Sequence, residues 1–316
     1  MLSKKKIAVV VPAYNEEKLI DIVIKTMPKY IDAIYIVDDC STDKTRSRVR
    51  GLIKGKEKRI KLIELEKNSG VGAAIVRGYR QAISDGMEVV AVMAGDAQMD
   101  PNDLKHILLP VVEEEADYTK GNRLFTGEAW KVIPKHRYFG NAFLSLLTKI
   151  SSGYWHLADS QAGFTAISAN AIKMLPLEEL YPRYGYPNHM LAMLNVYKQR
   201  VRDIPIRPVY NIGEKSGIRL SRVIPSLSWL LFKNFMWRLW EKYVIRDFHP
   251  LVFFYMLAVL LLGASIPLLA RMMIIWIETN NLPPINTLAF IFTAITGWQS
   301  LFFAMWFDMD YNKNLR

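Results

Sequence analysis

Two oxygen-bearing side chains stand two residues apart where a predicted buried strand ends. The apolar run Val89–Met93 is typical of such a strand, and small residues separate it from Asp96 and Gln98. A carboxylate and an amide in a glycine-containing turn suit a hard divalent cation, because Mg²⁺ is usually held by one or two carboxylates together with substrate phosphates. Alternatively, Asp96 and Asp100 are turn formers that cap the helix beginning near Asn102. The turn alone leaves both interpretations open.

Further polar clusters follow other apolar runs. Ile7–Ala13 and Ala33–Val37 read as buried strands, with a third strand at 60–65, and helical segments separate them. This alternation predicts a parallel sheet with right-handed crossovers, in which ligands bind beyond the carboxyl ends of the strands. Pro12–Glu16 and Asp38–Asp39 are therefore expected at the same edge as Asp96–Gln98. For the two adjacent acids, ordinary turn chemistry explains the pattern equally well.

A basic group follows later in the chain. Arg123 ends a predicted strand, and Arg137 lies four residues before Asn141 on a predicted helix, so these two share one helix face. Guanidinium groups are permanently charged and bind two phosphate oxygens at once. The group therefore predicts a phosphate site, with a solvated basic surface as the alternative. The isolated histidines His156 and His189 are expected to be packed or surface residues rather than ligands.

Composition narrows the class of protein. The 316 residues carry a formal net charge of +11, which favours anionic partners such as nucleic acid, acidic membrane surfaces or phosphorylated substrates. The one cysteine, Cys40, excludes a disulfide within the chain and a cysteine-based zinc cluster. Hydrophobic residues make up 51% of the chain, and the excess is concentrated near the C-terminus. A soluble part followed by a membrane part is expected.

Three segments divide the chain: residues 1–220 as the catalytic domain, 221–249 as interfacial amphipathic helix, and 250–316 as a transmembrane hairpin. In the second segment aromatic residues recur at helical spacing opposite Asn234, Arg238, Glu241 and Lys242, which fits a helix in the headgroup region, with packing on the soluble domain as the alternative. Residues 251–270 and 285–307 are uncharged and long enough to span a bilayer. Lysines and arginines concentrate before the first span and after the second, so the positive-inside rule predicts a multi-pass protein of the cell membrane whose two ends and catalytic domain are cytoplasmic.

Four motifs together resemble one family. The stretches VVVPAYNEE, Asp38–Asp39 followed by Ser41 and Asp43, NSGVGAA and AGDAQMDP occur in the order found in family 2 glycosyltransferases of the GT-A fold. Within that family the chain resembles the dolichol-phosphate mannose synthases and related polyprenyl-phosphate sugar transferases, over roughly residues 7–219. The resemblance implies an α/β fold of the GT-A, Rossmann-like type, a mostly parallel sheet with helices on both faces.

The resemblance also implies roles for individual residues. The nucleotide sugar would be bound by Pro12, Tyr14, Glu16, Asp38, Asp39, Asp96, Arg207 and Lys215, with Arg219 as a further phosphate contact. Asp96 and Gln98 would hold Mg²⁺ or Mn²⁺, and Arg123, Arg137 and Asn141 would bind the lipid phosphate, so that Asp96, Arg123 and Arg137 are the expected catalytic residues. Asp159 would face the acceptor.

One position departs from the family pattern. Ala94 stands where the family has the first aspartate of an Asp-x-Asp turn. Either diphosphate and water complete the metal ligands, or another acid replaces the missing carboxylate, with Asp38 as the candidate.

The expected activity is transfer of a hexose, with inversion, from a nucleotide sugar to dolichyl or another polyprenyl phosphate at a lipid bilayer, without a nucleic acid partner. Mannose from GDP-mannose is the first expectation and UDP-glucose the alternative donor. A processive polysaccharide synthase is disfavoured because the Gln-x-x-Arg-Trp motif is missing. The alternative from another functional class is a non-catalytic membrane protein that binds sugar nucleotide or lipid phosphate.

Overall fold

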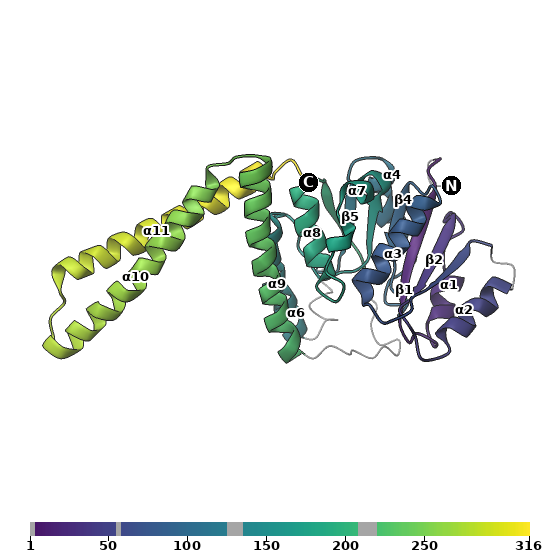
Figure 1. Cartoon of the computed structure of the whole chain (residues 1–316), viewed down its shortest axis with the longest axis horizontal. Helices are drawn as coiled ribbons and strands as arrows, with labels where there is room; N and C mark the ends of the chain where they lie inside the picture. Colours follow the sequence, from purple (N-terminus) through teal and green to yellow (C-terminus); the bar gives the residue numbers. More distant parts are fainter. Residues whose placement is uncertain (1–3, 55–57, 125–134, 208–219) are drawn as a thin grey trace. The chain divides into compact units, whose positions relative to one another are not determined.

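The computed structural model describes residues 4–54, 58–124, 135–207 and 220–316, without the side chains of residues 135–142 and 220–224 (Figure 1). It divides the chain into two compact units, and each is described by itself. The first unit comprises Met1–Phe235 and Asn314–Arg316, and the second comprises Met236–Lys313. The three-part division expected from the sequence stays a prediction.

A seven-stranded mixed sheet forms the centre of the first unit. Its strands are β1 (Ile7–Ala13), β2 (Ala33–Asp38), β3 (Ile60–Glu64), β4 (Val89–Val92), β5 (Tyr118–Asn122), β6 (Thr165–Ser168) and β7 (Val201–Pro205), in the order β3-β2-β1-β4-β6-β5-β7. All neighbours pair in parallel except β6, which is antiparallel to β4 and β5. The mostly parallel α/β sheet predicted from the sequence is confirmed.

Helices cover both faces of this sheet (Figure 1). The helices described in this unit are α1 (Ile20–Lys25), α2 (Thr45–Lys54), α3 (Val71–Ser84), α4 (Leu104–Val112), α6 (Lys135–Ser152), α7 (Ala169–Met174), η1 (Leu177–Glu179), α8 (Tyr186–Val196) and the part of α9 (Leu220–Trp240) up to Phe235. Alternate residues of β1 reach opposite faces, as strand geometry requires. Val9 and Val11 belong to the buried cluster that includes Leu108 of α4, whereas Val10 meets α3 at Gly78, where a Cβ atom would lie 2.4 Å from Val10 Cγ1.

The antiparallel strand β6 decides which loops meet at the functional edge. Because β6 runs against its neighbours, the segment that enters it lies at the edge where β4 and β5 end. The register pairs Thr165 with both Val92 of β4 and Lys120 of β5. The residues just before Thr165 therefore lie between the turn that follows β4 and the turn that follows β5.

The second unit contains a helical hairpin of α10 (Leu251–Thr279) and α11 (Pro284–Tyr311). Both helices are long and apolar enough to cross a membrane, with mean hydropathies of 2.4 and 1.6. The helix α10 continues past Arg271, where the predicted span stopped, and ends at Thr279. The next residue, Asn280, has a φ of 55°, the left-handed conformation common after a helix C-terminus.

A buried polar network joins the N-terminal part of this unit to the end of α11. Arg238 donates to both carboxylate oxygens of Asp308, at 2.7 and 3.0 Å, and Lys242 donates to Asn312 at 2.6 Å. Arg238 and Lys242 are fully buried, which corrects the expectation that they face the headgroups. Sequence spacing placed them opposite the exposed Trp240, but it did not reveal that α11 supplies their partners.

Candidate active site

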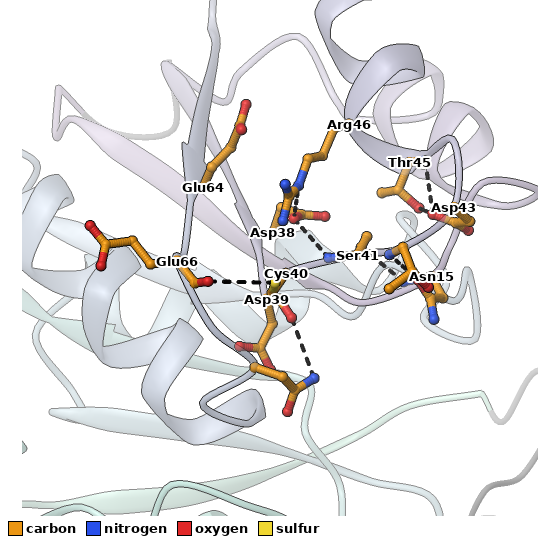
Figure 2. Close-up of polar contacts among 12 residues, drawn as sticks. Asn15, Asp38, Asp39, Cys40, Ser41, Asp43, Thr45, Arg46, Glu64 and Glu66 are labelled. Carbon is orange, nitrogen blue, oxygen red and sulfur yellow. Dashed lines mark hydrogen bonds and ion pairs between the residues drawn. The ribbon is translucent and has the colours of Figure 1, made fainter.

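Hydrogen bonds join the turn after β1 to the turn after β2 (Figure 2). The Asn15 backbone N–H donates to Ser41 Oγ at 3.0 Å, and the Thr42 backbone N–H donates to the Asn15 side-chain oxygen at 2.8 Å. The Glu16 N–H donates to Thr45 Oγ1 at 2.8 Å. Asn15 has a φ of 57°, a left-handed conformation that asparagine tolerates better than most residues. The predicted clusters Pro12–Glu16 and Asp38–Asp39 are thus joined by hydrogen bonds between their turns, and one of these bonds holds the backbone of Glu16 in place.

The paired acids of β2 have different partners. Asp38 is fully buried, and its Oδ2 accepts from the Ser41 N–H at 3.0 Å and from Arg46 Nε at 2.5 Å (Figure 2). Asp39 accepts from the backbone N–H groups of Ser69 and Gly70 at 2.7 and 2.8 Å. Asp38 is therefore engaged by Arg46, and Asp39 fixes the turn that begins α3. Their nucleotide-binding roles stay predictions.

The glycine-rich start of α3 packs against protein rather than forming a phosphate cradle. Gly70 has a φ of 95°, and a Cβ there would lie 2.5 Å from the Pro182 carbonyl oxygen. The Gly72 N–H donates to that same oxygen at 2.8 Å. This agrees with the sequence, which lacks the spacing of a phosphate loop.

The Asp96 turn lies beside the first cluster. The Gly95 N–H donates to the Pro12 carbonyl at 3.2 Å, and a Cβ on Gly95 would lie 3.4 Å from Glu16 Cγ. Within the turn, the Gln98 N–H donates to Asp96 Oδ1 at 3.1 Å, and Ala97 has a φ of 57°. A left-handed alanine costs about 1–2 kcal/mol, so the fold keeps an unfavourable backbone that shapes the turn between the two predicted metal ligands.

The charge around Asp96 favours a cation. Burial, followed by the negative charges of Asp96 and Asp43, raises the pKa of Glu16 to about 7. Glu16 is therefore an acid whose proton affinity responds to Asp96. A carboxyl that holds its proton near neutral pH marks a place where positive charge is lacking.

The residues present fit Mg²⁺ or Mn²⁺ bound together with a diphosphate. Among the described residues no group of three histidine, cysteine, aspartate or glutamate side chains can hold a metal by itself. Asp96 and Gln98 offer one carboxylate and one amide oxygen, and Glu16 lies next to their turn. One or two carboxylates completed by substrate phosphates is the usual magnesium arrangement.

A second cluster follows β5. Arg123 donates to Asp159 from its backbone N–H at 3.2 Å, from Nε at 2.7 Å and from Nη2 at 3.2 Å. Asp159 is fully buried, whereas the Arg123 side chain is 25% exposed. Burial raises the pKa of Asp159, but the charge and hydrogen bonds of Arg123 outweigh it and hold that pKa at about 2. The guanidinium is thus fixed at the protein surface by a buried carboxylate.

Two charged residues behind Arg123 were given no role in the sequence analysis. Lys120 is fully buried and donates to the Ala162 carbonyl at 2.9 Å, and burial lowers its pKa to about 8. Burial raises the pKa of Asp203 to about 6, and its Oδ1 is buried without a hydrogen bond. The sequence signal was weak, because a single lysine or aspartate inside a predicted strand or loop carries no spacing pattern.

The other predicted site residues are placed in part. Arg137 and Asn141 lie one turn apart on α6, but their side chains are outside the described residues. Lys215 and Arg219 also lie outside them. The Arg207 N–H donates to Asp103, at the start of α4, at 2.9 Å. Pro12 is buried and Tyr14 is exposed. The sheet edge thus brings together Pro12, Tyr14, Glu16, Asp38, Asp39, Asp96 and Gln98, with Arg123 after β5.

Fold and site together define a sugar transferase of the GT-A type. The glucosyl-3-phosphoglycerate synthase of Mycobacterium tuberculosis, solved with Mn²⁺, UDP and its glucosyl product, has a similar fold: the TM-score is 0.54 at 18% identity, covering 75% of this chain and 82% of that one. The family model for glycosyl transferase family 2 matches residues 8–175. The chain belongs to glycosyl transferase family 2, and it is an enzyme that transfers glycosyl groups.

Two curated relatives extend the comparison. The UDP-N-acetylglucosamine–dolichyl-phosphate N-acetylglucosaminyltransferase of Methanococcus voltae is 29% identical over 221 residues, covering 66% of this chain and 88% of the relative. A dolichyl-phosphate beta-glucosyltransferase of Trichomonas vaginalis is 26% identical over 259 residues, covering 76% of each chain. Both are named for a dolichyl-phosphate acceptor, and they differ in the sugar.

Proposed function

We propose that this glycosyltransferase moves a hexose from a nucleotide sugar to the phosphate of a polyprenyl lipid, at a membrane to which α10 and α11 anchor it. The observation that carries the proposal is the meeting of the acidic Asp96 turn and the partly exposed guanidinium of Arg123 at one sheet edge. The Asp96 turn suits a metal-bound diphosphate, and Arg123 suits a second phosphate. The sheet order β4-β6-β5 places one strand between them.

The reaction needs alignment more than acid–base chemistry. An acceptor phosphate is already anionic, so no strong base has to remove a proton from it before it attacks the anomeric carbon. Arg123 would bind this phosphate, and Asp159 would keep the guanidinium in one orientation. Holding nucleophile and anomeric carbon in line converts binding energy into rate. Attack opposite to the leaving diphosphate inverts the configuration.

The donor would lie along the first cluster. Pro12, Tyr14, Glu16, Asp38 and Asp39 would surround the base and ribose, and Arg207 and Lys215 would add charge near the diphosphate. Asp96 and Gln98 would hold Mg²⁺ or Mn²⁺, which when bound neutralises the charge that develops on the leaving diphosphate. On the acceptor side, Arg137 and Asn141 of α6 would join Arg123.

The membrane arrangement belongs to the same proposal. The side chains of Trp229, Phe232, Met236 and Trp240 on α9 are exposed, as an interfacial helix requires. With the catalytic domain and both termini cytoplasmic, the lipid phosphate would meet Arg123 from the headgroup layer.

A transfer assay with the full-length chain in lipid nanodiscs tests the proposal. Radiolabelled GDP-mannose, UDP-glucose and UDP-N-acetylglucosamine would each be offered with dolichyl and undecaprenyl phosphate, and labelled lipid would be counted after extraction. The first donor is the sequence-based expectation, and the names of the two relatives motivate the others. Metal-dependent transfer of one sugar to lipid phosphate is expected. Consumption of donor without labelled lipid would contradict the proposal.

A pair of variants separates the metal role from turn formation. Asp96→Ala should abolish transfer, because it removes the only carboxylate of the Asp96–Gln98 turn. Asp100→Ala is the matched control, since Asp100 accepts from the Asn102 N–H at 2.8 Å as an ordinary turn residue before α4. Equal loss of transfer in both variants would indicate that the turn only needs its shape.

A further inference from the structure

The segment Asp159–Gly163 lies beside the place where we expect the transferred sugar to bind. It enters the antiparallel strand β6, between β4 and β5. At its start, Asp159 binds Arg123, the predicted acceptor residue. At its end, a Cβ on Gly163 would lie 3.6 Å from Cε of Met99, the residue that follows Gln98. In any in-line transfer the sugar lies between the two phosphates, so this segment lies beside it.

One side chain of this segment is held by its amide nitrogen. Gln161 Nε2 donates to Ser160 Oγ at 3.0 Å and to Asn188 Oδ1 at 3.1 Å. These two bonds use both hydrogens of the amide group. The Gln161 side chain is half-buried. Its carbonyl oxygen is therefore the polar atom of the amide that remains for a ligand.

The support for Gln161 comes from the interior. Asn188, on α8, is fully buried, and its Oδ1 also accepts from Thr148 Oγ1 of α6 at 3.0 Å. Ser160 is buried too, and its N–H donates to Ser145 Oγ at 3.3 Å. Two helices, α6 and α8, thus support one amide.

Asn188 Nδ2 is buried without a hydrogen-bond partner. An orphaned buried donor is costly, and native structures contain few of them. Turning Asn188 alone would place its NH₂ group against the donor group of Gln161, so the two amides are oriented together. The cost of the orphaned group is consistent with a network that serves to orient Gln161.

We propose that Gln161 is a specificity-determining residue that accepts a hydrogen bond from a hydroxyl or amide N–H of the transferred sugar. The inference rests on the proposed function. A fixed acceptor favours sugars that present a hydrogen-bond donor at that position. A sugar without that donor would cover the Gln161 oxygen and leave it without a hydrogen bond, which costs binding energy. The residue would act on the sugar and leave the nucleotide and the lipid untouched.

The test compares Gln161→Ala with wild type in the full-length protein. The kcat/KM for the preferred donor should fall about three- to ten-fold, the range expected for one neutral hydrogen bond. The preference for that donor over a sugar with the same nucleotide but a different ring substituent should shrink by a similar factor. Affinity for the free nucleoside diphosphate, measured by calorimetry, should stay the same.

Gln81→Ala is the matched control, because Gln81 donates its amide to Asp85 at 3.1 Å near the far end of α3. It should leave all three quantities unchanged. An equal fall for every sugar, or a loss of affinity for the free nucleotide, would overturn the inference.

The two proposals fail in distinguishable ways. If the wild type transfers no sugar to lipid phosphate, the proposed function falls. Binding then decides the role of Gln161: a weaker affinity of Gln161→Ala for the nucleotide sugar, with unchanged affinity for the free nucleotide, supports it. Equal affinities of variant and wild type for the nucleotide sugar overturn it.

Discussion

Replacing Asp159 by asparagine removes a buried charge while preserving the shape of the side chain. Asp159 is fully buried, and it accepts three hydrogen bonds from Arg123. Its pKa is held at about 2, against 3.8 for a free carboxyl. This difference corresponds to roughly 2–3 kcal/mol of folded-state stabilisation at neutral pH. Because the folded pKa is the lower one, that stabilisation is present above pH 4 and is lost as pH falls toward 2.

The expected thermal effect follows from that free energy. For a domain of this size, 1 kcal/mol corresponds to about 2–4 °C in Tm, so Asp159→Asn should lower the Tm by about 5–10 °C at pH 7. The measurement is tryptophan fluorescence during heating in nanodiscs. Asp117→Asn is the matched control: Asp117 also accepts from a backbone N–H and a guanidinium, both of Arg200, but the two side chains are 26% and 40% exposed. A surface pair contributes at most about 1 kcal/mol, and its loss should cost less than about 4 °C.

The same variant should also affect the acceptor. A neutral amide holds Arg123 less firmly, so the KM for polyprenyl phosphate should rise about ten-fold, the effect of weakening one charge-assisted bond. The KM for the nucleotide sugar should change little. Equal Tm shifts for the Asp159 and Asp117 variants, or an unchanged acceptor KM, would refute the assignment of Asp159 as the residue that positions Arg123.

Three further predictions concern charge. Ala94→Asp should tighten Mn²⁺ binding several-fold by restoring a carboxylate; an unchanged midpoint in a Mn²⁺ titration followed by electron paramagnetic resonance would mean that position 94 faces away from the ion. In the wild type, Mn²⁺ affinity should rise with pH through about 7, where Glu16 loses its proton, and Glu16→Gln should remove that rise; a rise that persists excludes Glu16 as its source. Asp203 has a folded pKa of about 6, above its unfolded value, so its protonation stabilises the fold below pH 4 and this stabilisation is lost as pH rises through 6. Asp203→Asn should therefore flatten Tm between pH 4 and 7, and an unaltered profile would contradict this.

Local sequence determined the elements that carry the donor half of the site. Short apolar runs rich in β-branched residues favour buried strands, and the predicted bounds are those of the observed strand for Ile7–Ala13 and match to within one residue for Ala33–Val37. Alternation with helices then fixed a mostly parallel sheet, and parallel strands bring their carboxyl ends to one edge. The proximity of Glu16 to the Asp96 turn follows from these local rules. The length of the apolar runs likewise identified α10 and α11, since a helix needs about 20 consecutive apolar residues to cross the bilayer core.

Contacts between distant residues were decided only by the tertiary structure. Nothing in the sequence around Thr165 states that β6 runs antiparallel, yet this direction brings Asp159 and Gln161 to the functional edge. The partners of buried charges are equally non-local: Arg238 is 70 residues from Asp308. A helical pattern shows which residues share a face, but whether that face meets water or a buried carboxylate depends on what the rest of the chain packs against it. Secondary structure is encoded within a few residues, whereas the pairing of buried polar groups is a property of the assembled fold.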